Sequence, residues 1–188
     1  MEKIAETKYP VQEVIRRRWS ARSFDSAPIS NAIAEQLIEA ASWASSSMNE
    51  QPWLYIYAHR ESENFKKFVE ALLPGNQVWA QHAAVLMISL VKTHFDNGNV
   101  NRHAMHDVGA ANQNLMLEAT SEGIVGHLLG GFDMTKTKEL FEIPQGYEPA
   151  VFIALGYPGD VTSLPEPFQS RETAPRKRKP LNEVGIKL

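Results

Sequence analysis

Cysteine is absent from this sequence of 188 residues. Its absence excludes disulfide bonds, thiolate-bound metals, iron–sulfur clusters and a cysteine nucleophile. A chain without disulfides also suits a reducing compartment. The sequence therefore offers no thiol chemistry of any kind.

Long hydrophobic runs are also missing. The longest, residues 83–91, is far shorter than the roughly 20 residues that a transmembrane helix needs. Residues 1–10 are polar and charged, which does not fit a signal peptide. We therefore expect a soluble, cytoplasmic protein with no membrane partner.

Strong net charge and the common nucleotide-binding motifs are missing as well. The formal net charge is −3, so the chain has no overall attraction to nucleic acid. Neither G-x-G-x-x-G nor G-x-x-x-x-G-K-[ST] occurs. Strands and helices do not alternate strictly, and we find no repeat or linker. These features favour a single α+β domain over residues 1–188 rather than a doubly wound fold.

Apolar spacing and turn residues predict the order of the elements. Helices are predicted at 11–18, at 30–43 with a cap at Ser30, at 65–72 with an end at Pro74, at 104–121, and from a cap at Asp133. Strands are predicted at 53–59, 83–91, 123–128 and 150–156. From residue 158 onward the chain is rich in proline, serine and charge, which indicates an arm rather than a packed element.

Four arginines, Arg16, Arg17, Arg18 and Arg22, surround the end of the first predicted helix. Cations suit a helix C-terminus, and this accounts for Arg16 and Arg17 as solvated side chains. The preference of cations for a helix C-terminus explains Arg22 less well, because Arg22 lies beyond the helix beside the hydroxyl residue Ser23. Arginine and serine together form a natural phosphate site. The segment alone leaves an anion site and a solvated helix end as alternatives.

Two further segments have both a structural and a ligand-binding interpretation. The loop at 46–53 carries amides that could match the pyrimidine edge of a flavin, although on chemistry alone an ordinary turn explains it better. The segment at 126–132 ends in Gly130-Gly131, where the backbone could approach a ligand closely or merely turn.

Two clusters give weaker indications. The basic run at 176–179 indicates a solvated tail, and nucleic-acid binding is the alternative, more specific interpretation. His103, His106 and Asp107 would share a helix face, yet no further ligand at a diagnostic spacing supports a metal site. We expect no metal and no nucleic-acid partner.

Taken together and in order, these segments resemble the nitroreductase family of flavoproteins. The resemblance rests on segments 18–24, 46–53, 107–115, 123–126, 130–132 and 176–184. It implies an α+β fold with a central mixed sheet flanked by helices. It also implies a homodimer in which a C-terminal arm, about residues 158–188, is exchanged between subunits, with FMN bound at the shared interface.

The resemblance implies cofactor-binding roles by position. Arg18, Ser20 and Arg22 would lie by the phosphate and ribityl chain, with backbone contacts from Trp19, and Arg22 would reach the N1/O2 edge. The flavin of the partner subunit would be approached by Ser46, Ser47 and Asn49. The ring near N5 would be lined by Leu129, Gly130 and Gly131. The phosphate would be covered by Arg176 and Arg178. Departures from the family pattern are Ser45 in place of proline and Gly130 in place of an acidic residue.

The implied activity is an NADH- or NADPH-driven, two-step reduction of a nitroaromatic, a quinone or a similar flat small molecule. The flavin would carry the chemistry, so no catalytic side chain is expected. The alternatives are a specialised flavin enzyme of the same fold, such as a dehalogenase, an oxidase or a flavin-consuming enzyme, and a non-enzymatic binding module. The region at 73–83 gives no residue that we can place at the pyrimidine edge.

Overall fold

The computed structural model describes residues 3–188. In chain order its elements are α1 (Glu13–Arg17), α2 (Asn31–Ser42), the 3-10 helix η1 (Ser47–Asn49), β1 (Trp53–His59), α3 (Phe65–Ala71), α4 (Pro74–Ala80), β2 (Val85–Lys92), α5 (Ala104–Ser121), β3 (Val125–Leu129), α6 (Met134–Leu140), β4 (Tyr147–Gly156), the 3-10 helix η2 (Val161–Ser163), α7 (Phe168–Thr173) and α8 (Leu181–Val184).

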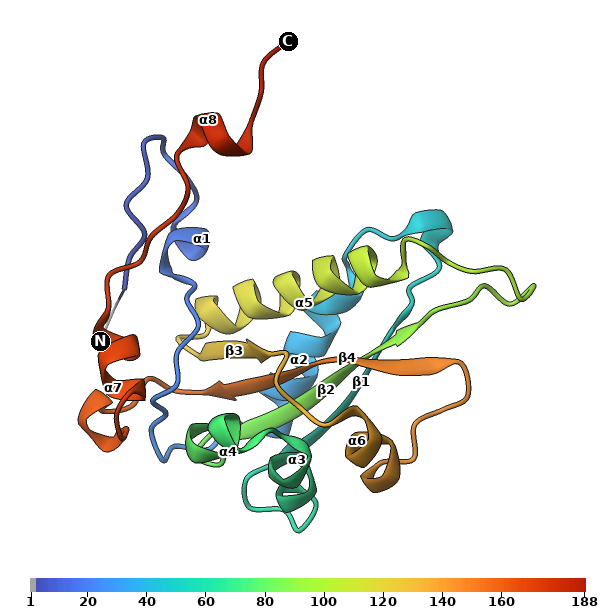
Figure 1. Ribbon diagram of the computed structural model, residues 1–188, viewed down its shortest axis with the longest axis horizontal. Coiled ribbons are helices and arrows are strands. Elements are labelled where there is room, and N and C mark those ends of the chain that lie inside the picture. The colour runs from blue at the N-terminus through green and yellow to red at the C-terminus, as the bar shows by residue number, and fades with distance from the viewer. Residues whose placement is uncertain (1–2) are drawn as a thin grey trace.

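The four strands form one sheet in the order β1-β2-β4-β3 (Figure 1), and every neighbouring pair is antiparallel. The expectation of a mixed sheet is therefore wrong for the strands, although the α+β class is confirmed. A parallel pairing joins Ser20 to Gly126, but only as an isolated bridge at the edge. The continuous apolar run of β2 does not require a parallel sheet, because helices cover both faces of this antiparallel one.

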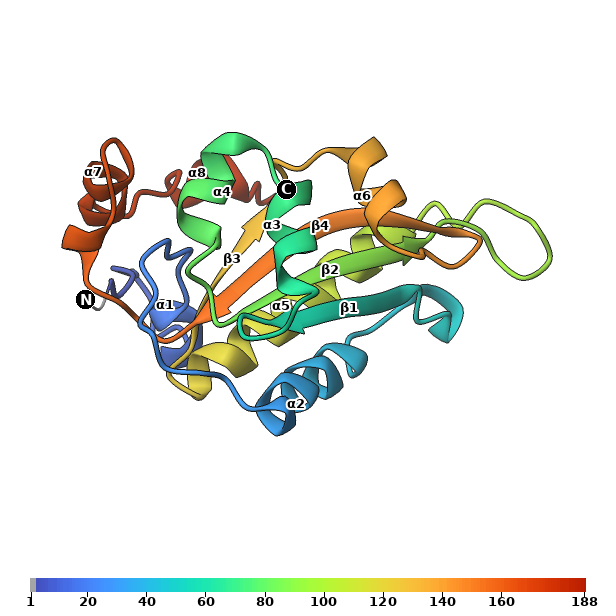
Figure 2. The same cartoon turned by 90° about the horizontal axis from the view of Figure 1, so that it is seen from below.

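The helices form a layer on each face of the sheet. Figure 2 shows α3, α4 and α6 in front of the strands and α5 behind them. One core cluster lies under α3 and α4 and includes Phe68, Trp79 and Phe152. The other lies under α2 and α5 and includes Leu37 and Leu115. Side chains of β2 contribute to both clusters, which explains why nearly the whole strand is buried.

Local chemistry sets most element boundaries. The predicted caps are confirmed, since Ser30 accepts a hydrogen bond from the Ile33 N–H and Asp133 accepts one from the Lys136 N–H. The predicted helix 104–121 coincides with α5. Pro74 is a correction: it ends no helix but occupies the first turn of α4, where the missing N–H costs nothing.

The C-terminal region is also partly different from the expected arm. Residues 158–173 pack against the domain through η2 and α7, and they bury Leu164 and Glu172. Only the part after α7 runs along the N-terminal segment and projects from the domain with α8 at its end (Figure 1). Exchange of this segment between subunits stays a prediction. No helix within residues 3–188 is both long and apolar enough to cross a membrane.

Candidate functional site

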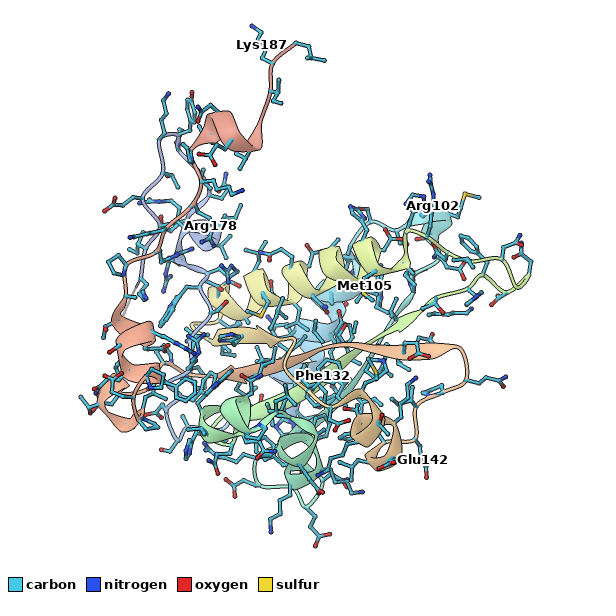
Figure 3. The ribbon with its side chains drawn as sticks, in the orientation of Figure 1. Arg102, Met105, Phe132, Glu142, Arg178 and Lys187 are labelled. Atoms are coloured by element: carbon cyan, nitrogen blue, oxygen red, sulfur yellow. The ribbon has the colours of Figure 1, made fainter. Side chains whose placement is uncertain are left out.

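Three arginines from opposite ends of the chain meet beside α1. Arg18 directly follows α1, whereas Arg176 and Arg178 lie on the segment after α7. Nη1 of Arg176 donates to the carbonyl oxygens of Lys3 (2.6 Å) and Arg16 (2.7 Å), which ties this segment to the N-terminal one. Figure 3 labels Arg178 on the same segment, close to α1. The structure thus brings together three of the predicted phosphate contacts.

These three arginines repel one another. Burial lowers the pKa of Arg18, and the charges of Arg176 and Arg178 lower it further. Burial and the charge of Arg178 also lower the pKa of Arg176. Within residues 3–188, no carboxylate lies within ion-pair distance of any of the three. A phosphate bound among them would relieve the repulsion, and guanidinium groups bind phosphate through paired hydrogen bonds.

Arg16 is not the solvated side chain that the sequence predicts. Its Nη1 lies 3.0 Å from Oε2 of Glu13, and its Nε donates to the carbonyl oxygen of Ala5 at 3.3 Å. Its own carbonyl accepts the bond from Arg176. Arg16 therefore joins the two terminal segments rather than merely decorating a helix end.

Arg22 lies on a turn that three elements hold. Its guanidinium carbon is 5.8 Å from the ring centre of Trp79 in α4, and its Nη1 is 3.8 Å from Oε2 of Glu172 in α7. From β3, Nδ1 of His127 donates to the carbonyl oxygen of Ala21 at 3.1 Å. Burial lowers the pKa of Arg22, while the charge of Glu172 opposes that shift.

Sequence reasoning missed both Glu172 and His127. Their contacts with this turn join residues that are 150 and 106 positions apart. No local pattern marks either residue, so only the tertiary structure identifies them.

Trp19 and Ser20 lie between the two arginine positions in different environments. Trp19 is buried, and Nζ of Lys3 lies 4.9 Å from its ring centre. Ser20 is exposed, and its backbone pairs with Gly126 near the start of β3. A cofactor could reach the hydroxyl of Ser20, whereas Trp19 could contribute only backbone groups, as the resemblance implies.

The serine-rich loop around η1 has a constrained backbone. Met48, Asn49 and Gln51 have positive φ angles of 57°, 56° and 51°. Such angles are uncommon for residues other than glycine and gather at functional sites. The loop is anchored by Asp107 of α5, a residue only 3% exposed, whose Oδ2 accepts the Ser47 N–H at 2.9 Å.

This loop and the arginine cluster lie at opposite ends of α5. Asp107 is in the first turn of the helix, whereas Thr120 near its end shares a small surface pocket with Arg17 and Trp19. At 1.5 Å per residue the two positions are about 20 Å apart. The structure therefore does not bring Ser46, Ser47 and Asn49 to the arginines within one chain, which fits their expected approach from a partner subunit.

The segment at the end of β3 offers backbone rather than side chains. Leu129 points into the core and is 2% exposed. At Gly130 an added Cβ would meet nothing within 4 Å, but at Gly131 it would lie 2.6 Å from Nδ2 of Asn76. The Gly131 carbonyl accepts bonds from this amide and from the Leu73 N–H. The helix α4, which the sequence did not predict, thus fixes the backbone at Gly131.

Within residues 3–188, no group of three or more His, Asp or Glu side chains is placed to hold a metal ion. Of the histidines considered from the sequence, His103 accepts a hydrogen bond from Nε of Arg102 at 3.2 Å. His106 is exposed, and its Nδ1 lies 3.1 Å from Oδ1 of Asp107.

Comparison with known proteins identifies the family to which this chain is similar. The model of the nitroreductase family matches residues 15–91 and 58–157. A protein of Archaeoglobus fulgidus, provisionally named NADH dehydrogenase/NAD(P)H nitroreductase, is 32% identical over 79% of this chain and 85% of its own length. A crystal structure of an oxidoreductase containing FMN is 35% identical, with a TM-score of 0.92, over 97% of this chain and 93% of that chain.

A more distant structure supports the fold alone. A provisionally assigned nitroreductase of Desulfovibrio desulfuricans, solved in complex with FMN, is 21% identical with a TM-score of 0.75. The alignment covers 97% of this chain and 98% of that one.

Proposed function

Because the chain belongs to the nitroreductase family, we propose that it is an FMN-dependent oxidoreductase that passes electrons from NADH or NADPH to a flat, electron-poor acceptor such as a nitroaromatic or a quinone. The observation that carries the proposal is the cluster of Arg18, Arg176 and Arg178, three coupled cations without a carboxylate partner within residues 3–188. A terminal phosphate suits this cluster. The absence of a dinucleotide fingerprint favours FMN over FAD.

The other predicted residues would bind and orient the cofactor, which when bound supplies the redox chemistry. Arg22, held between Trp79 and Glu172, offers a positive charge that would stabilise negative charge at the N1/O2 edge. Gly130 leaves room for close approach. At Gly131 the carbonyl is already engaged, so its N–H is the group available to the ring.

The direct test is an absorbance spectrum followed during anaerobic addition of NADH or NADPH. We expect purified protein to be yellow, to release FMN and not FAD on heating, and to lose its yellow colour when the nucleotide is added and the flavin is reduced. Colourless protein that does not take up added FMN would contradict the proposal. Bound FMN that neither nucleotide reduces would instead favour a specialised flavin enzyme of the same fold.

Steady-state kinetics test the two-step cycle in the same preparation. One open face visited in turn by nucleotide and acceptor gives parallel double-reciprocal lines over a grid of both substrates. Intersecting lines would show a ternary complex and contradict the cycle.

We also propose that the active form is a homodimer. The serine-rich loop lies far from the arginines within one chain. Trp43 shortly before the loop is 82% exposed, and Met48 within it is 87% exposed. A second copy would bring loop and arginines together and cover these apolar side chains. Light scattering should give about twice 21.1 kDa, and a monomer that retains FMN would contradict this assembly.

A further inference from the structure

The carboxylate of Glu172 is a buried charge beside the proposed cofactor site. The residue is 1% exposed. Its Oε1 accepts the N–H groups of Arg22 (2.8 Å) and Ser23 (3.1 Å), and its carbonyl oxygen accepts a bond from Nζ of Lys3 at 2.7 Å. Its Oε2 is buried and has no hydrogen-bond partner among the described residues, but it lies 3.8 Å from Nη1 of Arg22.

A purely structural role does not account for a charge at this position. Burying a carboxylate costs several kcal/mol unless a cation compensates for it. A neutral glutamine, of nearly the same shape, could accept the same two backbone N–H groups through its amide oxygen. What only the carboxylate adds is its electrostatic interaction with nearby cations. Burial lowers the pKa of Lys3, and the charge of Glu172 opposes that shift. The carboxylate also lies within ion-pair distance of the Arg22 guanidinium, which is the group that we place at the N1/O2 edge.

We propose that Glu172 is a positioning residue that fixes the Arg22 turn and offsets part of the Arg22 charge, and thereby sets how strongly the site favours reduced over oxidised FMN. The inference rests on the proposed function. Two-electron reduction places negative charge at the N1/O2 edge. An uncompensated Arg22 would therefore favour the reduced cofactor, and Glu172 limits that preference.

The test compares the two-electron midpoint potential of bound FMN, measured by dye equilibration, with the FMN dissociation constant. In Glu172→Gln the turn keeps its acceptor while the negative charge is lost. We expect oxidised FMN to bind within about threefold of the wild type. The preference for the reduced form should rise about tenfold, which is about 30 mV for a two-electron couple.

The matched control is Glu166→Gln. Glu166 is an exposed glutamate next to α7, and within residues 3–188 its carboxylate accepts hydrogen bonds only from Ser170. It should change neither quantity. A double-mutant cycle with Arg22→Gln shows whether Glu172 acts through Arg22, because the effect of Glu172→Gln should vanish in that background. A midpoint in Glu172→Gln equal to that of Glu166→Gln overturns the inference.

Two other variants decide the matter if Glu172→Gln does not fold. Glu172→Asp keeps the charge and should hold the redox preference within about twofold of the wild type, whereas Arg22→Gln should lower it about tenfold. Equal shifts in both variants overturn the inference. Failure of wild-type protein to bind FMN would refute the proposed function itself, and it would be seen before any variant is compared.

Discussion

Replacing Arg18 with alanine is expected to weaken FMN binding ten- to a hundredfold while leaving the fold intact. Hydrogen bonds between charged groups contribute about 1.5–3 kcal/mol each, and Arg18 is the member of the cluster whose pKa both Arg176 and Arg178 lower. In the absence of cofactor its charge is unfavourable for the cluster. The free energy of unfolding of the apoprotein should therefore stay the same or rise. Fluorescence titration of apoprotein with FMN and urea unfolding measure the two effects.

Lys67→Ala is the matched control for this experiment. Lys67 is an exposed cation of α3, on the face of the sheet opposite to α5 (Figure 2), and it lies outside both the arginine cluster and the serine-rich loop. It should bind FMN like the wild type. Arg16 is unsuitable as a control because it joins the terminal segments. If Arg18→Ala and Lys67→Ala had equal affinities for FMN, Arg18 would be only a cation at a helix end.

Helix caps and the spacing of apolar residues were sufficient to predict several of the helices. The Ser30 and Asp133 side chains cap α2 and α6, and the spacing of apolar residues gives α5 with its observed ends. The prediction that Pro74 ends a helix was wrong, because proline can also begin the next helix, as it does in α4. The mixed sheet that the resemblance implied was wrong, because every neighbouring pair of strands is antiparallel. The apolar run of β2 could not have corrected it, because burial on both faces does not determine strand direction.

In the candidate site, too, some residues could be predicted from the sequence and others only from the tertiary structure. Runs of arginine, serine and glycine mark where a cofactor could be held, and the structure brings Arg18, Arg176 and Arg178 together. The neighbouring segments are oriented by Glu172, which binds the Arg22 turn, and by Asp107, which binds the serine-rich loop. Each is a single acidic residue far along the chain from its target. A carboxylate that binds backbone N–H groups leaves no pattern in the sequence of the segment it holds.

His127 gives the protein a second measurable property, a loss of stability in mild acid. Burial is the main cause that lowers the pKa of His127 to about 4. The charges of Arg22 and Arg18 lower this pKa as well, whereas the hydrogen bond to the Ala21 carbonyl opposes the shift. In the unfolded chain the same group titrates near 6.5. Between these values the unfolded state binds more protons, so the free energy of unfolding rises with pH. The contribution of neutral His127 to the free energy of unfolding is complete above about pH 6.5 and is lost as the pH falls toward 4. It amounts to about 3 kcal/mol.

The variant His127→Asn tests this expectation, because its amide can donate to Ala21 but cannot titrate. Urea unfolding at a series of pH values, at one protein concentration, should show that the wild type loses more stability between pH 6.5 and 4 than the variant does. The difference in slope should approach 1.4 kcal/mol per pH unit, about one proton. His82→Asn, at an exposed histidine, should keep the wild-type slope, and parallel curves for wild type and His127→Asn would contradict the assignment. Bound FMN should reduce the difference, because its phosphate would offset the arginine charges that help to keep His127 neutral.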